Sequence, residues 1–335
     1  SLRRIMTPAT GAKYANILYP IRGAEAINKG ESEPETMGVR ALDERTLEIT
    51  LESPTPYFLE LLTHQTALPV HPASVEEHGQ EFTRPENMVS NGAYTLVSFT
   101  PNDKLVMETN PEFHAADTVS IDRVEYIPFE DRAACVRRFE AGEVQSCDDL
   151  PAEQIEFLKE SLGDQVRISP YLGTYYFALN TQAEPLDDMR VRQALSMVVD
   201  REFLAEEIWG GAMLPAYGFV PPGIGNYVEN PPTVDYADLP MFDREEQAIA
   251  LMEEAGYGPD NPIELEVSYN TSENHKNTTT ALADMWAPLG ITITQNVRDL
   301  SAHYAHLRDT DDYQIARAGW IGDYSDPQNF LFLVR

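Results

Sequence analysis

The sequence is poor in positive charge. Its 335 residues include 55 acidic side chains but only 24 Lys and Arg, so the formal net charge is −31. Binding a phosphate backbone requires clustered Lys and Arg, so this balance excludes nucleic acid as a partner and disfavours anionic membrane surfaces. Arg outnumbers Lys, which together with the many carboxylates suggests a salty habitat, where their repulsion is screened. An ordinary acidic protein accounts for the composition equally well.

Long apolar runs and cysteines are also scarce. No run of about 18 apolar residues occurs, so no membrane-spanning helix is expected. The first residue is not Met, so the lack of a signal peptide says little about targeting. Cys135 and Cys147 are the only cysteines, and their spacing of twelve makes no metal-binding knuckle. We expect two buried free thiols in preference to a disulfide, although the spacing allows either.

The first half of the chain predicts short helices and two β-hairpins. Alternating apolar residues predict a hairpin over 38–54 that turns at 43–45, and another over 92–113 that turns at 101–103. Helical segments are expected over 12–28, interrupted by Pro20 and Gly23, over 55–64, over 131–141 before Gly142, and over 152–162. Strands are expected at 123–129 and directly after Gly142.

The second half changes to a regular alternation. An aromatic-rich strand is expected at 174–180, followed by helices over 188–200 and 201–211, a long Pro-rich loop and a helix over 244–256. Residues 263–320 then read as strand, helix, strand, helix, strand, which predicts a largely parallel sheet. Ligands of such sheets bind beyond the carboxyl ends of the strands, and Asp323 lies just past one of them.

Five segments together carry a family resemblance. They are "NGAYTLVSF", "RRFEAGEV", "MRVRQALSMVVDREF", "LPAYGFVPPG" and "ARAGWIGDYSDP". In this order and spacing they resemble the periplasmic peptide-binding proteins of ABC importers, solute-binding protein family 5, and most of all its oligopeptide-binding members. The resemblance covers essentially the whole chain.

The resemblance implies an α/β, multi-lobed fold of the periplasmic-binding-protein type (type II). Mixed sheets with flanking helices would enclose a ligand in an interlobe cleft. Residues 1–70 would form part of the small second lobe, 71–170 part of the first lobe, and 171–335 the third lobe, with most ligand-binding residues. Family members are longer, so the chain is expected to be truncated at both ends.

The implied function is capture of short oligopeptides and their delivery to the membrane permease subunits of an ABC importer. The protein would be a monomer without enzymatic activity or cofactor, in the periplasm or on the cell surface with a lipid anchor. A general peptide binder must hold an ammonium, a carboxylate and backbone amides, which suit an Asp, an Arg or His, and an open strand edge, respectively.

The resemblance also assigns the binding residues. Asp323 would bind the peptide amine, and Arg317 and His275 would meet the carboxylate of peptides of different length. Six further residues would contribute backbone contacts or cleft walls: Gly319, Trp320, Ile321, Tyr171, Tyr176 and Arg308. Arg317 and Asp323 are six residues apart, at most about 20 Å on an extended strand, which could bracket a short peptide.

Several positions depart from the family pattern. Trp209 stands where relatives have a Lys, no aromatic occurs near Leu300, and Cys147 stands near a family Tyr. Gly173 and Ile321 occupy the positions of a family cysteine pair.

Two alternatives remain open. One is a family 5 binder of a dipeptide, nickel chelate, opine or sugar. The other is a metallohydrolase that uses His303 and His306, although their spacing of three differs from the zincin pattern.

Overall fold

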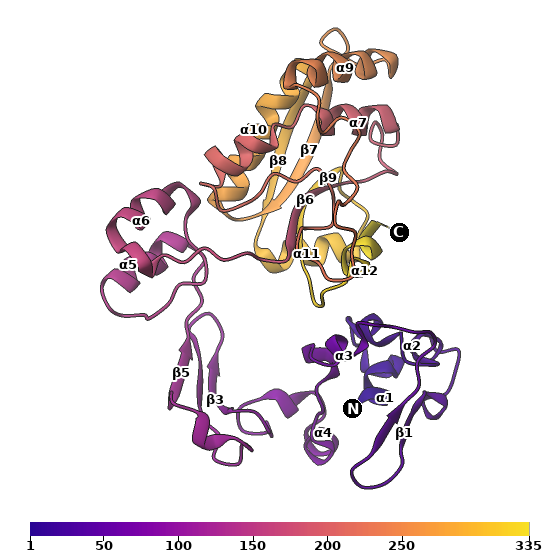
Figure 1. Ribbon diagram of the computed structural model, residues 1–335, viewed down its shortest axis with the longest axis vertical. Helices are drawn as coiled ribbons and strands as arrows, with labels where there is room; N and C mark the ends of the chain where they lie inside the picture. Colours follow the sequence, from indigo (N-terminus) through magenta and orange to yellow (C-terminus); the bar gives the residue numbers. More distant parts are fainter. Residues whose placement is uncertain (335) are drawn as a thin grey trace. The chain divides into compact units, whose positions relative to one another are not determined.

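The computed structural model describes residues 1–334 and divides into two compact units (Figure 1). Unit 1 contains Ser1–Phe129 and the short segment Asp323–Ser325. Unit 2 contains Glu130–Gly322 and the chain from Asp326 onward. The chain therefore passes from unit 2 into unit 1 at Asp323 and returns after Ser325. The expected lobe boundaries near residues 70 and 170 stay a prediction.

Unit 1 combines four short helices with two small antiparallel sheets. The helices are α1 (Leu2–Met6), α2 (Ala24–Asn28), α3 (Phe58–Leu61) and α4 (Pro72–His78). Strands β1 (Val39–Ala41) and β2 (Leu47–Ile49) form one hairpin. Strands β3 (Tyr94–Thr100), β4 (Lys104–Thr109) and β5 (Arg123–Tyr126) form the other sheet. Both predicted hairpins are confirmed.

The core of unit 1 gathers apolar side chains from its first sixty residues. Met6, Leu18, Ile21 and Ile27 are fully buried, and Leu61 of α3 joins them. Pro20 and Gly23 interrupt the helical segments as expected. A 3-10 turn ends at Leu18, and α2 begins after Gly23, which takes the left-handed conformation.

Unit 2 holds one four-stranded sheet and most of the longer helices. Its helices are α5 (Arg132–Glu140), α6 (Ile155–Leu162), α7 (Met189–Met197), α8 (Arg201–Phe203), α9 (Met241–Glu254), α10 (Glu273–Trp286), α11 (Leu300–Asp309) and α12 (Gln328–Leu331). A π-helical turn, Leu204–Ile208, extends α8. The strand expected after Gly142 is wrong, because residues 143–150 form bends and irregular backbone.

Cys135 and Cys147 form a disulfide, so the expectation of two free thiols is wrong. Gly142 lies just past the end of α5 in the left-handed region, with φ +74°. The chain reverses there, and Arg138 pairs with Glu143 at 2.7 Å. The reversal brings the two cysteine Cα atoms to 6.0 Å, a separation that a disulfide can span.

The sheet of unit 2 has the strand order β6-β9-β7-β8. Its strands are β6 (Gly173–Leu179), β7 (Ile263–Asn270), β8 (Ile291–Arg298) and β9 (Ile315–Ile321). β7 pairs in parallel with both β8 and β9, which confirms the parallel sheet expected from residues 263–320. β6 joins the other side of β9 in the antiparallel direction.

Helices pack on this sheet through a continuous apolar core. Leu265 and Val267 of β7 are fully buried among Leu195 of α7, Met252 of α9 and Trp286 of α10. The Trp286 indole also donates a hydrogen bond to the carbonyl of Leu195 at 3.0 Å. This contact fixes α10 against α7 and so sets where the first turn of α10 lies.

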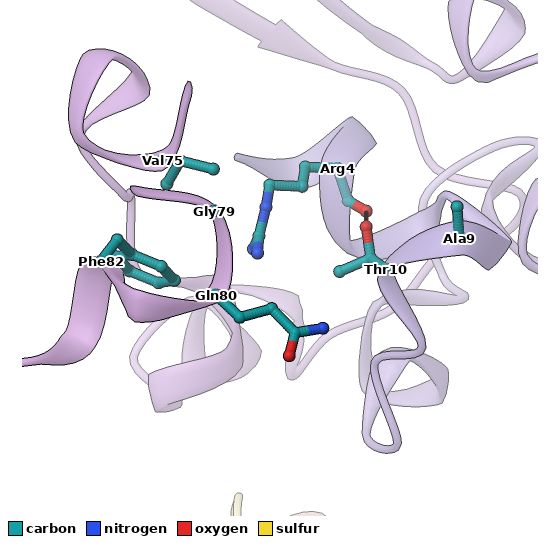
Figure 2. Close-up of a pocket in the computed structure, with 7 residues that line it drawn as sticks. All are labelled: Arg4, Ala9, Thr10, Val75, Gly79, Gln80 and Phe82. Carbon is teal, nitrogen blue, oxygen red and sulfur yellow. Dashed lines mark hydrogen bonds between the residues drawn. The ribbon is translucent and has the colours of Figure 1, made fainter. Parts of the chain in front are cut away.

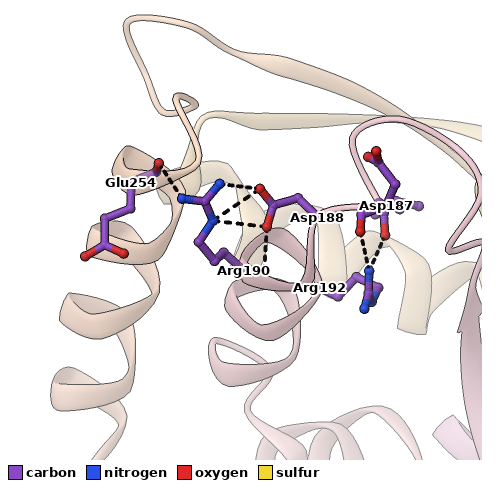
Figure 3. A network of polar contacts seen from close by, with 6 residues as sticks. Asp187, Asp188, Arg190, Arg192 and Glu254 are labelled. Carbon is purple, nitrogen blue, oxygen red and sulfur yellow. Dashed lines mark hydrogen bonds and ion pairs between the residues drawn. The ribbon is translucent and has the colours of Figure 1, made fainter.

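The arginines of the "MRVRQAL" segment bind backbone carbonyls and Asp188 (Figure 3). The Arg190 guanidinium donates three hydrogen bonds to the Asp188 carboxylate and one to the carbonyl of Glu254, at the end of α9. Arg192 donates to the carbonyls of Leu186 and Asp187. This segment therefore fixes the loop before α7 and joins it to α9.

No helix within residues 1–334 is both long enough and apolar enough to cross a membrane.

Candidate functional site

Strand β9 pairs with its two neighbours over different lengths. Its register with β6 is complete, from Gly173 opposite Ile321 to Leu179 opposite Ile315. Its register with β7 covers only Ile315 and Ala316. Across residues 1–334, no strand pairs with 317–321 on the side of β9 that faces away from β6. The last five residues of β9 thus form an open edge.

The hydrogen bonds at the two ends of the β6–β9 pair show which groups face this edge. The amide of Gly322 donates to the carbonyl of Leu172 at 2.7 Å, and that of Asn180 to Gln314 at 2.9 Å. Because bonded and non-bonded pairs alternate between antiparallel strands, even-numbered residues of β9 bond to β6. Gly319 and Ile321 therefore direct their amide and carbonyl groups toward the open edge.

The carbonyl of Arg317 faces the same side and is already occupied. The Nε2 atom of His303 donates to it at 2.8 Å, and the His303 side chain is fully buried. Burial lowers the pKa of His303, which keeps the imidazole neutral. His303 therefore fixes the backbone of β9 where the open edge begins.

The Arg317 guanidinium is held by neutral groups. Its Nη1 donates to Asn270 Oδ1 at 3.0 Å and to the Tyr304 hydroxyl at 2.9 Å. Its central carbon lies 4.9 Å from the centre of the Tyr175 ring. A Cβ at Gly319, the residue opposite Tyr175, would lie 3.6 Å from Arg317 Nη2, an ordinary van der Waals contact.

The same guanidinium has unused hydrogen-bonding capacity. Its Nε atom is buried without a hydrogen-bond partner. In the part of the chain that the structure describes, Arg317 forms no ion pair with a carboxylate. A partly buried cation held only by neutral groups is a favourable place for an incoming anion.

His275 lies beside Arg317, in the first turn of α10, and is only 3% exposed. Its Nδ1 atom is 3.3 Å from the Tyr175 hydroxyl. Burial, with a smaller contribution from the Arg317 cation, lowers the pKa of His275 to about 3. Trp209 packs edge-on against Tyr175 and donates from Nε1 to Thr278 at 3.1 Å. At neutral pH, His275 can therefore offer a hydrogen bond but no positive charge.

Asp323 packs within unit 1, although Arg317 belongs to unit 2. Its carboxylate accepts a hydrogen bond from the Tyr14 hydroxyl and lies 3.4 Å from His64 Nε2. Burial and the hydrogen bond to Asp323 raise the pKa of Tyr14, so its hydroxyl remains a donor. The Asp323 side chain is 18% exposed. Arg317 and Asp323 thus have separate partners.

Two contacts hold the residues after Asp323 in place. Tyr324 stacks on Tyr57, with ring centres 4.8 Å apart. The amide of Ser325 donates to the Glu60 carboxylate at 2.8 Å. Both partners lie at α3, so this helix positions the Asp323 carboxylate.

The comparisons with known proteins fit this arrangement. The whole chain, residues 1–335, matches the family described as "Bacterial extracellular solute-binding proteins, family 5 Middle". The periplasmic oligopeptide-binding protein OppA of Escherichia coli (strain K12) is 35% identical over 337 residues, 99% of this chain and 61% of that protein. The chain belongs to family 5 of the bacterial extracellular solute-binding proteins. The family expected from the sequence motifs is confirmed.

Solved structures confirm the expected fold class of this family 5 chain. OppA of Burkholderia pseudomallei has a TM-score of 0.93 and 36% identity, over 100% of this chain and 66% of that one. Haemophilus influenzae OppA in complex with the peptide RPPGFSPFR has a TM-score of 0.88 and 34% identity, over 98% and 65%. The family 5 chain therefore spans only 61% to 66% of the length of these three relatives.

The remaining predicted binding residues of the family 5 chain lie at or near β6 and β9. Tyr171 precedes β6 and is 74% exposed. Ile321 ends β9 and is 47% exposed. Tyr176 packs edge-on against Phe219 at 5.1 Å, and burial raises its pKa. Trp320 donates to Asn329 at 2.9 Å.

Within residues 1–334, Arg308 forms no hydrogen bond or ion pair with these residues. It is exposed near the end of α11 and forms an ion pair with Asp309 at 2.8 Å. The structure thus brings Arg317, His275 and Gly319 together around Tyr175, and places Arg308 on a solvated surface.

Sequence reasoning missed several residues that contact the predicted ones. Tyr14 and His64 bond to Asp323 from far along the chain, and Tyr304 and Asn270 bond to Arg317. Only Asn270 carried a usable signal, because it ends a buried parallel strand. The others are ordinary aromatic and polar residues of short helices and loops, and only the tertiary fold reveals their contacts.

Unit 1 also contains a cavity of about 350 Å³ (Figure 2). Its walls come from the start of the chain and from residues near α4. The Arg4 guanidinium points into it, 5.4 Å from the centre of the Phe82 ring. None of the predicted binding residues lines it.

The histidines of the metallohydrolase alternative bond to different carbonyls. His303 Nε2 donates to Arg317, whereas His306 Nε2 donates to Asp312 at 2.7 Å. Within residues 1–334, no group of three or more His, Cys, Asp or Glu side chains is arranged to hold a metal ion.

Proposed function

We propose that the chain belongs to an extracytoplasmic solute-binding protein that captures short oligopeptides and delivers them to an ABC importer. It acts in the periplasm, or on the cell surface if a lipid anchor is present, as a monomer and as a binder rather than an enzyme. Permease subunits in the membrane are its partners. The observation that carries the proposal is the open edge of β9 in unit 2, which begins at Arg317, a cation that forms no ion pair with a carboxylate in the described residues.

The open edge recognises what all peptides share. A peptide in extended conformation alongside Gly319 and Ile321 receives and donates main-chain hydrogen bonds, as in β-strand addition. Because these bonds involve no ligand side chains, they hold peptides of different sequence equally well. The absence of a side chain at Gly319 lets the ligand backbone approach closely.

The two charged groups serve the peptide termini. Asp323 forms charge-assisted hydrogen bonds with an ammonium group, and its contacts to Tyr14 and His64 hold the carboxylate in one orientation. The buried, unpartnered Nε of Arg317 suits a carboxylate. His275 adds a neutral hydrogen bond beside it. We retain Trp320, Ile321, Tyr171 and Tyr176 as cleft walls and Arg308 as a peripheral cation.

The relatives support the peptide as ligand. The Haemophilus influenzae protein forms a complex with RPPGFSPFR, and the curated relatives include oligopeptide-binding and murein peptide-binding proteins. A relative of similar identity is named as a probable deoxycholate-binding protein, so the ligand class needs a direct test.

Calorimetry on the full-length protein tests the amine site. Trialanine should bind, and N-acetyl-trialanine should bind at least about tenfold more weakly, because a partly buried charge pair loses one member. Asp323→Asn should weaken trialanine binding by a similar factor and reduce the effect of acetylation. Asp311→Asn, an exposed carboxylate twelve residues away, serves as the matched control.

The outcome distinguishes two kinds of failure. Equal affinity for free and acetylated trialanine contradicts the role of Asp323. No binding of any peptide of two to five residues, together with a non-peptide ligand in native mass spectra, contradicts the peptide class itself. Arg317→Ala should weaken the binding of peptides of one length more than that of others. An equal loss of affinity at all lengths contradicts the prediction that Arg317 and His275 serve peptides of different length.

A further inference from the structure

A groove of about 580 Å³ on unit 2 is lined by residues of α9, α10 and the end of α8. We call it the α9–α10 groove. Its apolar lining comes mainly from Phe203, Ile208, Met241 and Met285. Its volume is in the range of pockets that hold small organic ligands.

The α9–α10 groove is separate from the peptide site proposed above. On α10, His275 and Trp286 face the protein interior, where both are almost fully buried. The groove is lined by other positions of the same helix, Asn277, Ala281 and Asp284. These follow a spacing of four and three residues, which places them on one face. One face of α10 thus carries His275 of the proposed peptide site, and another face lines the α9–α10 groove.

The charges at the groove all have one sign. Asp200, Glu245 and Asp284 line it, and no Lys or Arg does. Asp200 caps α8 by accepting from the Phe203 amide at 2.9 Å. Within residues 1–334, the carboxylates of Glu245 and Asp284 form no hydrogen bond or ion pair. The groove therefore offers two uncompensated carboxylates next to apolar side chains.

We propose that the α9–α10 groove binds an amphiphilic cation, an apolar group that carries a primary ammonium. The apolar part removes Phe203, which is 42% exposed, and its neighbours from water. The ammonium lies between the apolar lining and the carboxylates of Glu245 and Asp284. The net charge of −31 further favours a cationic ligand over an anionic one of the same shape.

Three probes of equal length separate the apolar and ionic contributions. They are 4-phenylbutylamine, 4-phenylbutan-1-ol and 4-phenylbutanoate, titrated by ligand-observed NMR into the full-length protein saturated with trialanine. The amine should bind most tightly, the alcohol more weakly and the carboxylate least. Raising the salt concentration should weaken the amine and leave the alcohol nearly unchanged, because exposed ion pairs are screened.

Matched variants place the binding in the groove. Glu245→Gln with Asp284→Asn should weaken the amine roughly threefold to tenfold and leave the alcohol unchanged. Phe203→Ala should weaken both. Glu246→Gln and Phe242→Ala change neighbouring residues that do not line the groove, and neither should alter binding.

The test is independent of the peptide site. The proposal is overturned if the amine does not bind, if the carboxylate probe binds equally well, or if the variants at Glu245, Asp284 and Phe203 have no effect. Displacement of the amine by trialanine also overturns it, because the probe would then occupy the peptide site. If trialanine itself does not bind, the same titrations on the free protein still decide the matter.

Discussion

His275 shows how burial changes the role of a residue type. An exposed histidine next to a peptide carboxylate would carry a positive charge over part of the physiological pH range. Here the imidazole is packed between Tyr175 and Trp209, beside the Arg317 guanidinium, and its pKa is lowered to about 3. Arg317 is therefore the cation of this pair, and His275 is a neutral hydrogen-bonding partner.

This burial predicts a specific dependence of stability on pH. The unfolded chain protonates His275 below about pH 6.5, whereas the folded protein does so only near pH 3. The free energy of unfolding therefore has its full value, as far as His275 is concerned, above pH 6.5. It decreases as the pH falls toward 3, at up to about 1.4 kcal/mol per pH unit. Urea unfolding between pH 7 and pH 4.5 measures this slope.

A variant isolates the contribution of this one residue. His275→Asn should lose less stability on acidification than the unsubstituted protein does, because its side chain cannot take up a proton. His114→Asn, at an exposed position, should keep the original slope. Identical slopes for all three proteins would show that His275 is not buried in the neutral form.

Strand β9 is the element on which the proposed peptide site depends. Its alternating geometry predicts which amides should change on ligand binding. Those of Ala318 and Trp320 bond to β6, so they should exchange slowly in the free protein. Those of Gly319 and Ile321 face the open edge, and trialanine should slow their hydrogen exchange. Exchange measured by NMR at single residues, with binding monitored separately, checks this pattern. Unchanged exchange at Gly319 and Ile321 in the bound state would refute main-chain recognition.

Gly319→Ala tests whether the peptide backbone approaches the open edge closely at this residue. A Cβ there makes only ordinary contacts of 3.6 Å, so the free energy of unfolding should be almost unchanged. Peptide affinity should fall about tenfold or more, because the methyl group hinders the close approach of the ligand backbone. Gly290→Ala is the contrasting control, since its Cβ would lie 2.3 Å from Gly258 and should destabilise the fold. Full peptide affinity in Gly319→Ala would contradict this arrangement.

The loop closed by Cys135 and Cys147 gives a prediction for a second element. Cys135→Ala with Cys147→Ala should lower the free energy of unfolding by roughly 3 kcal/mol, as expected for a closed loop of this size. A reducing agent should destabilise the unsubstituted protein similarly and leave the double variant unaffected. Two reactive thiols in the denatured, unreduced protein would contradict the disulfide.

The elements illustrate what the sequence could and could not predict. Alternation around residues 43–45 and 101–103 was enough for two hairpins, and the order of residues 263–320 was enough for a parallel sheet. No pattern in the sequence predicts that β9 stops pairing with β7 after Ala316, because the pairing of strands depends on packing between distant segments. The Cys135–Cys147 disulfide depended on the chain reversal at Gly142, where a strand had been expected instead.

At the scale of the whole molecule, the partition of the chain was the least predictable feature. Asp323–Ser325 belong to unit 1 because Tyr14, Tyr57 and Glu60 hold them there, and these contacts join residues more than 250 positions apart. Family motifs predict Asp323 as a binding residue. They could not identify the partners that orient its carboxylate.

The excess of acidic residues predicts a stabilising effect of salt. With a net charge of −31, repulsion between carboxylates opposes the compact state, and salt screens it. The midpoint of thermal unfolding should rise most between about 0.01 M and 0.3 M NaCl, where the Debye length falls from about 30 Å to below 10 Å. Sucrose at matched osmolality is the control for non-ionic effects. A midpoint independent of salt over this range would show that the charges are too dispersed to repel.

The open edge of β9 has a cost when no ligand is present. Unpaired main-chain groups on a strand can pair with a strand of another molecule, which makes exposed edges starting points for aggregation. The edge here is only five residues long and begins at a charged arginine, and both features limit such pairing. A peptide that occupies the edge removes the hazard altogether. The protein without peptide should therefore aggregate on storage or heating, and saturation with peptide should slow this aggregation.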